Sequence, residues 1–129
     1  MVSYLVLDDS SVIRKVARRI IEDMGCHVMD AADGAEAMQI CRHSMPDAII
    51  VDWIMPNMSG TEFIIEFKAK FGQVAANTQL IYCTHEMNIP EMAKAKRAGA
   101  THFIMKPFNK QILRKKLAEI RGTQVEQAA

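Results

Sequence analysis

Residues 49–60 decide the fold, and they read Ile-Ile-Val-Asp-Trp-Ile-Met-Pro-Asn-Met-Ser-Gly. Together with Ala48, the first three residues form a continuous apolar run of strand length, which predicts a strand buried on both faces of a parallel sheet. The run stops at a carboxylate, Asp52, and a loop shaped by Pro56 and Gly60 follows. Asp52 then has two interpretations: it caps the next turn, or it is a reactive carboxylate at the sheet rim, where open α/β folds place ligands.

Four further segments have the length and apolar character of strands, and segments with helical spacing alternate with them. The strands are predicted at 4–7, 27–31, 80–83 and 102–105, and the helices at about 12–24, 37–41, 60–71, 89–98 and 110–121. In the first helix, Val12, Val16 and Ile20 form one apolar stripe, and Ile13, Ala17 and Met24 form a second stripe beside it. The other face of this helix is basic and carries Arg14, Lys15, Arg18 and Arg19. This alternation predicts a single α/β domain, with a parallel five-stranded sheet covered on both faces and right-handed crossovers.

Size and charge exclude several classes of protein. The chain has 129 residues, 50% of them hydrophobic and 24% charged, which suits one domain with a buried core. Its net charge of +1 argues against a general nucleic-acid binder or a polybasic membrane anchor. No apolar run approaches the roughly 20 residues that span a bilayer, and the N-terminus lacks the pattern of a signal peptide. We therefore expect a cytoplasmic protein without membrane insertion.

The cysteines form no Cys-x-x-Cys pair, although each has a histidine within two positions. They are Cys26, Cys41 and Cys83, beside His27, His43 and His85. A zinc site built from these residues is an alternative, but the usual ligand spacings are absent. Reduced, partly buried thiols are the favoured interpretation.

Four of the five predicted strands end on a polar or charged group: Asp8-Asp9, Asp52, Thr84 and Lys106. Because the carboxyl ends of parallel strands lie at one edge, these side chains should converge. Crowded carboxylates raise one another's pKa unless a cation lies among them, and their oxygens suit Mg²⁺ or Mn²⁺. With a hydroxyl and an ammonium nearby, Asp52 could attack phosphorus as a nucleophile. Taken singly, Thr84 could be a turn former and Lys106 a snorkelling strand-end lysine.

On these residues the chain resembles the receiver domains of two-component response regulators, in particular stand-alone ones similar to the chemotaxis response regulator. The resemblance rests on Val6-Leu7-Asp8-Asp9-Ser10, Val51-Asp52-Trp53-Ile54-Met55-Pro56 with Gly60, Thr84, and Lys106-Pro107-Phe108. It implies a doubly wound (βα)5 domain over residues 1–121, with the flavodoxin-like strand order 2-1-3-4-5. Residues 122–129 are predicted to be a disordered tail.

The resemblance implies a role for each carboxylate. Asp52 would be the phosphoacceptor. Asp9, Asp52 and the backbone carbonyl of Ile54 would bind Mg²⁺ (or Mn²⁺) directly, while Asp8 would act largely through water.

The resemblance also implies a conformational switch. Thr84 and Lys106 would contact the phosphoryl oxygens, and the Lys106–Pro107 bond would be cis. Phe103 would turn inward when Thr84 moves toward the phosphoryl group; the alternative is that Phe103 is a plain core aromatic. Two positions depart from the commoner pattern, because His85 stands where a small residue is usual and Ile54 where a polar one is frequent.

The implied function is a phosphorylation-activated signalling switch that is not an enzyme. It would receive the phosphoryl group from a phosphohistidine on a sensor histidine kinase or a histidine phosphotransferase, with the basic first helix as a docking site for the kinase. It would then bind a downstream protein through residues 89–98, 102–105 and 110–121, and would not bind nucleic acid directly. The alternative is a phosphorelay intermediate or phosphate sink between histidine-containing proteins.

Two fold mates are disfavoured. An aspartate-nucleophile phosphatase needs an Asp-x-Asp motif and usually a cap insertion, whereas Asp8 and Asp9 are adjacent and the chain is short. A flavin-binding protein needs a phosphate-binding loop where acids stand here.

Overall fold

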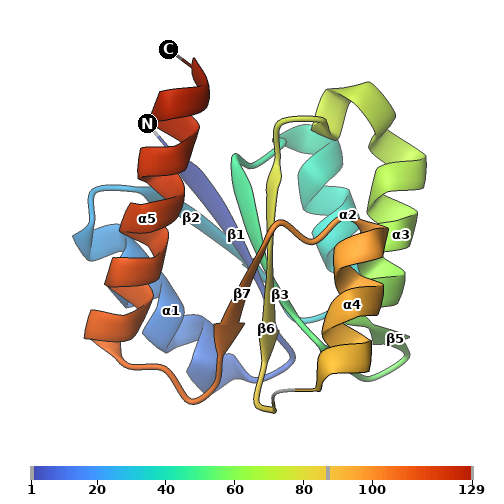
Figure 1. Cartoon of the computed structure of the whole chain (residues 1–129), viewed down its shortest axis with the longest axis horizontal. Coiled ribbons are helices and arrows are strands. Elements are labelled where there is room, and N and C mark those ends of the chain that lie inside the picture. The colour runs from blue at the N-terminus through green and yellow to red at the C-terminus, as the bar shows by residue number, and fades with distance from the viewer. Residues whose placement is uncertain (1, 87, 129) are drawn as a thin grey trace.

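The structure is a computed structural model that describes residues 2–86 and 88–128, with the side chains of residues 2–86 and 88–120. Its main sheet is parallel and has the order β2-β1-β3-β6-β7 (Figure 1). The strands are β1 (Ser3–Leu7), β2 (His27–Ala31), β3 (Ala48–Asp52), β6 (Gln79–Thr84) and β7 (His102–Met105). Counted along the chain, this is the predicted order 2-1-3-4-5, which the structure confirms.

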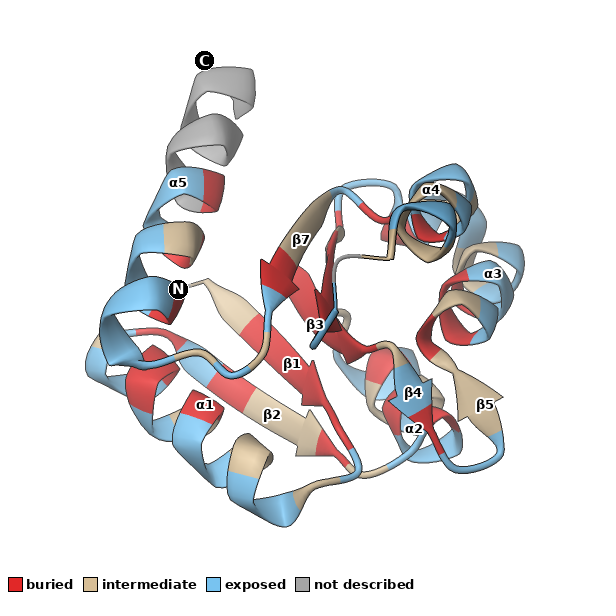
Figure 2. Ribbon diagram, turned by 60° about the horizontal axis from the view of Figure 1, so that its bottom comes forward, coloured by how far each residue is buried: buried red, intermediate tan, exposed pale blue. Residues whose placement is uncertain are grey.

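Helices cover both faces of the sheet (Figure 1). One face carries α1 (Ser11–Asp23) and α5 (Lys110–Ala128); the other carries α2 (Gly34–His43), α3 (Gly60–Phe71) and α4 (Ile89–Ala98). On α5, the apolar side chains of Leu113, Leu117 and Ile120 are buried. The central strand β3 is buried along its whole length (Figure 2), as its unbroken apolar run predicts.

The buried face of α1 differs from the predicted stripe. Val12 and Val16 are 67% and 43% exposed, and the buried residues of this helix are Ala17, Ile20 and Ile21. Two neighbouring apolar stripes run along this helix, and periodicity does not select between them. Tertiary packing does, because α1 packs on β1, β2 and α5 with the side that carries Ala17, Ile20 and Ile21.

The segment after β3 is more regular than the predicted loop. Strands β4 (Ile54–Met55) and β5 (Met58–Ser59) pair antiparallel around Asn57, which has a positive φ of 71°. A side chain at Gly60 would collide with the backbone carbonyl of Asp52 and lie 3.1 Å from the ring of Tyr82. Glycine therefore allows α3 to begin directly behind the end of β3.

The remaining predictions concern the ends and the cysteines. A short 3-10 helix, η1 (Gly72–Ala75), lies within the loop predicted after α3. Helix α5 is assigned through Ala128, but the side chains beyond Ile120 lie outside the described residues, so the predicted disorder of residues 122–129 stays a prediction. All three cysteines are buried, and none forms a disulfide within the described part of the chain. Among the described helices, none combines the length and apolarity needed to cross a membrane.

Candidate functional site

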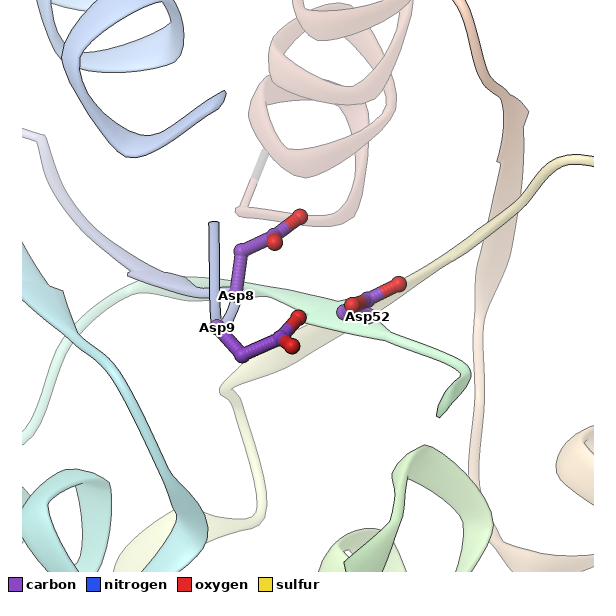
Figure 3. Close-up of side chains that lie close together, drawn as sticks. All are labelled: Asp8, Asp9 and Asp52. Atoms are coloured by element: carbon purple, nitrogen blue, oxygen red, sulfur yellow. The ribbon is translucent and has the colours of Figure 1, made fainter. Parts of the chain in front are cut away.

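The three predicted carboxylates converge at the carboxyl edge of the sheet. Asp8 and Asp9 directly follow β1, Asp52 ends β3, and these two strands are neighbours. Figure 3 shows the three side chains close together, with those of Asp8 and Asp9 pointing toward the side of Asp52, and ligand oxygens of all three lie within 4.8 Å of each other. Among the described residues this is the only group of acids, cysteines and histidines that could hold a metal ion, so no zinc cluster forms there.

Lys106 directly follows β7, the edge strand of the sheet, and its side chain completes the site. Its Nζ donates hydrogen bonds to Asp8 Oδ2 at 2.6 Å and to Asp52 Oδ1 at 3.0 Å. The following Lys106–Pro107 bond is cis, as predicted. Asp8 Oδ1 accepts a third hydrogen bond from the backbone N–H of Ser10 at 2.9 Å. Lys106 thus bridges two of the three carboxylates.

Burial and mutual repulsion set the electrostatics of the site. Asp8 and Asp52 are each 3% exposed, while Asp9 is exposed. Burial and the neighbouring Asp8 carboxylate raise the pKa of Asp52 to about 6, against the opposing effect of Lys106. For Lys106, burial lowers the pKa, but its hydrogen bonds to Asp8 and Asp52 outweigh burial and raise it. The three carboxylates carry more negative charge than the single ammonium neutralises. This excess negative charge suits a divalent cation that prefers oxygen ligands.

The raised pKa of Asp52 predicts how pH affects the metal-free fold. Since the folded protein holds the Asp52 proton up to about pH 6 and the unfolded chain only to about 3.8, ionisation destabilises the fold as pH rises through that window. We expect Asp52→Asn to exceed wild type in stability by about 1–2 kcal/mol near pH 8, allowing for solvent screening. The gain should vanish below about pH 4.

Thermal melts in EDTA across this pH range measure the effect. The exposed Asp23→Asn serves as the control, because its carboxylate lies at the surface. A melting temperature of Asp52→Asn equal to or below that of wild type near pH 8 would contradict the prediction.

Thr84 ends β6, the strand next to β3, and Phe103 lies within β7. The Thr84 hydroxyl donates to the Glu86 carbonyl at 3.1 Å and accepts from the Glu86 N–H at 3.3 Å, so its hydrogen bonds among the described residues lie within its own loop. Phe103 is partly buried, with its ring edge-on to Tyr82 at 5.9 Å between centroids. It also lines a cavity of about 260 Å³ beside α4, together with Ile89, Met92, Ala93 and Lys96.

Comparison with known families agrees with this geometry. The profile of the response regulator receiver domain matches residues 4–118, which is most of the chain. The chain belongs to the response regulator receiver domain family. As a receiver domain it is a signalling protein rather than an enzyme, and an acidic pocket able to bind a metal ion is typical of the family.

Among known proteins, this receiver domain is similar to chemotaxis proteins over nearly their whole length. It is 32% identical over 121 residues to the chemotaxis protein CheY homolog of Campylobacter jejuni, covering 92% of each chain. It is also 32% identical over 123 residues to CheY1 of Helicobacter pylori, covering 92% of this chain and 96% of the relative. The solved structure of CheY4 from Vibrio cholerae superposes with a TM-score of 0.86 at 34% identity, covering 92% of this chain and 98% of that chain.

The two unusual residues of this receiver domain are His85, directly after β6, and Ile54, two residues after Asp52. His85 is exposed, and its ring meets that of Trp53 edge-on, with centroids 5.5 Å apart. Trp53 directly follows Asp52 in the chain, so this ring pair begins one residue after the carboxylate at the end of β3. Ile54 begins β4 with its side chain 57% exposed.

One group of ion pairs near this site was not predicted from the sequence. Arg14 and Arg18 of α1, interpreted as part of a basic face, both bind the Asp30 carboxylate of β2, at 3.1 and 3.0 Å. Arg14 also donates to the backbone carbonyl of Asp8 at 2.8 Å. The one signal in the sequence is a lone acid near the end of a predicted edge strand, and that signal does not identify a partner.

Proposed function

We propose that this receiver domain is a phosphorylation-activated signalling switch that accepts a phosphoryl group on Asp52 from a phosphohistidine donor. One observation carries the proposal: the Asp52 carboxylate lies at the sheet edge among Asp8, Asp9 and Lys106. A carboxylate in this setting has a positioned ammonium beside it and two further acids that can hold a cation, which are the components that phosphoryl transfer requires.

The chemical step is an in-line displacement at phosphorus. An oxygen of Asp52 forms the new O–P bond while the P–N bond of the donor breaks, and the electron pair of that bond stays on the imidazole nitrogen. Lys106, held by Asp8, supports the negative charge of the phosphoryl oxygens. When held by Asp9, Asp52 and the backbone carbonyl of Ile54, with Asp8 acting through water, Mg²⁺ (or Mn²⁺) would neutralise the carboxylates and the incoming phosphoryl group.

Phosphorylation then changes the hydrogen bonding of Thr84. Its hydroxyl leaves the Glu86 carbonyl for a phosphoryl oxygen, and Phe103 turns inward toward the vacated space. The ring of Phe103 lines the cavity beside α4, so its movement alters that cavity. The surface formed by α4, β7 and α5 is therefore the proposed site for a downstream protein.

A pull-down with phosphorylated and unphosphorylated protein tests the proposal. We expect a downstream protein to bind the phosphorylated form preferentially, and equal recovery from both forms would contradict the switch. Efficient transfer of the phosphoryl group from the phosphorylated protein back to a histidine phosphotransferase would instead indicate that the protein is a phosphorelay intermediate or a phosphate sink. The cytoplasmic location and the absence of direct nucleic-acid binding stay predictions.

We propose that the docking site of the kinase on α1 uses the basic side chains of this helix that are not bound to Asp30. Arg14 and Arg18 are bound to Asp30, whereas Lys15 and Arg19 are exposed and form no ion pair with the described residues. Both line a groove of about 610 Å³ between α1 and the start of α5. We expect the double charge reversal Lys15→Glu/Arg19→Glu to slow transfer from the kinase by about tenfold or more while sparing a small phosphodonor. Parallel slowing of both reactions would argue against docking.

His85 and Ile54 should slow the chemistry of this receiver domain. The His85 ring, fixed against Trp53, narrows the approach of donor and water, and Ile54 offers no polar group to orient an attacking water. We expect His85→Ala to speed loading from a small donor and Ile54→Asn to speed hydrolysis, each by about three- to tenfold. Time courses of loading and decay measure both rates. Unchanged rates would show that His85 and Ile54 do not affect loading or hydrolysis. Glu86, two residues after Thr84, remains able to orient an attacking water.

A further inference from the structure

The backbone of Asp8 is held on both sides by groups outside its own loop. Its N–H donates to the carbonyl of Ala31 in β2 at 3.1 Å. Its carbonyl accepts a hydrogen bond from Nη1 of Arg14 in α1 at 2.8 Å. The Asp8 carbonyl belongs to the rigid, planar peptide unit that joins Asp8 to Asp9. Arg14 therefore fixes the orientation of the peptide from which Asp9 departs.

Arg14 is itself oriented by Asp30. Its Nε lies 3.1 Å from Asp30 Oδ2, while the other oxygen of that carboxylate binds Nη1 of Arg18 at 3.0 Å. The Arg14 side chain is only 19% exposed, against 42% for Arg18. A guanidinium can serve both acceptors because its donors point in fixed, separate directions, whereas a lysine offers a single nitrogen.

Asp9 depends on this backbone support more than its neighbours do. The carboxylates of Asp8 and Asp52 are both held by Lys106. Within the described part of the chain, the exposed Asp9 carboxylate forms no hydrogen bond or ion pair. The peptide that Arg14 holds therefore fixes the start of the Asp9 backbone, from which this carboxylate extends.

We propose that Arg14, oriented by Asp30, is a positioning residue for the cation site, acting by fixing the Asp8–Asp9 peptide so that the Asp9 carboxylate faces Asp52. The inference rests on the proposed function, because it assumes that the three acids bind Mg²⁺. Residues that orient metal ligands commonly change metal affinity by about 10–100-fold when removed.

The direction in which Mg²⁺ affinity changes when Arg14 is removed distinguishes a positioning role from simple charge repulsion. Arg14 is a cation near an acidic site, so its loss would tighten Mg²⁺ binding if only Coulomb repulsion mattered. Loss of positioning weakens binding instead. Arg18→Ala is a matched control, because it removes a neighbouring cation and an ion pair to the same Asp30 without touching Asp8.

The experiment is a Mg²⁺ titration of the full chain. Trp53 is the only tryptophan and adjoins Asp52, so its emission reports the site, and melts in EDTA monitor folding. We expect Arg14→Ala to weaken Mg²⁺ binding by about tenfold or more, with Arg18→Ala close to wild type. Asp30→Ala should weaken it less, and the double variant Arg14→Ala/Asp30→Ala should match Arg14→Ala alone, because Asp30 acts through Arg14.

Each outcome has a definite meaning. Wild type that binds no Mg²⁺ would overturn the metal site of the proposed function. Wild type that binds Mg²⁺ while Arg14→Ala binds equally or more tightly would overturn the positioning role alone. Equal weakening of Mg²⁺ binding by Arg14→Ala and Arg18→Ala would also overturn it. Both variants remove an ion pair to Asp30, so the loss of that ion pair would then explain the weakening without any contact to Asp8.

Discussion

Asp52→Asn should abolish phosphorylation of this receiver domain. The amide has almost the same shape as the carboxylate and can still accept a hydrogen bond from Lys106, so the site and the fold should survive. It lacks the anionic oxygen that forms the bond to phosphorus. Incubation of the wild type with Mg²⁺ and a small phosphodonor, or with a cognate histidine kinase, should add one phosphoryl group, and intact-mass analysis should show none on Asp52→Asn.

Two controls make this result specific to Asp52. Asp23→Asn removes an aspartate at the surface, which pairs with Lys110 at 3.8 Å, and should be labelled like wild type. Melts of Asp52→Asn in EDTA should show an intact fold, since removal of a buried charge relieves repulsion among the acids. Equal labelling of wild type and Asp52→Asn would exclude Asp52 as the acceptor.

The convergence of the site residues could be predicted because topology alone brings them together. Asp8, Asp52, Thr84 and Lys106 lie at the carboxyl ends of four strands of one parallel sheet, and such ends share an edge. The run Ile49–Val51 specifies a strand buried on both faces, and the structure places it at the centre of the sheet. These predictions needed no knowledge of any side-chain contact.

The contacts that support the site could not be predicted in the same way. The ion pair of Arg14 with Asp30 joins two elements whose relative rotation is set by packing. The same rotation leaves Val12 and Val16 exposed, although their spacing is that of a buried stripe. Likewise, residues 54–59 form a hairpin too short to give a periodic signal.

Removal of Asp9 should eliminate the effect of Mg²⁺ on stability. Lys106 already binds Asp8 and Asp52, whereas Asp9 is exposed and its carboxylate is available to a cation. We expect Mg²⁺ to bind wild type with a Kd in the micromolar to millimolar range. At about 100 times that Kd it should stabilise the fold by about 2.7 kcal/mol and raise Tm by roughly 10 °C. Asp9→Asn should show no such rise.

The comparison must separate specific binding from screening and from damage to the fold. Equal ionic strength supplied as NaCl screens repulsion among the acids but provides no ligand to the site, so it should reproduce only a small part of the wild-type shift. In EDTA, Asp9→Asn should be at least as stable as wild type, because the change removes a negative charge beside two buried carboxylates. A Mg²⁺ shift in Asp9→Asn as large as in wild type would show that the cation binds without this carboxylate, and the assignment of Asp9 as a direct ligand would then be wrong.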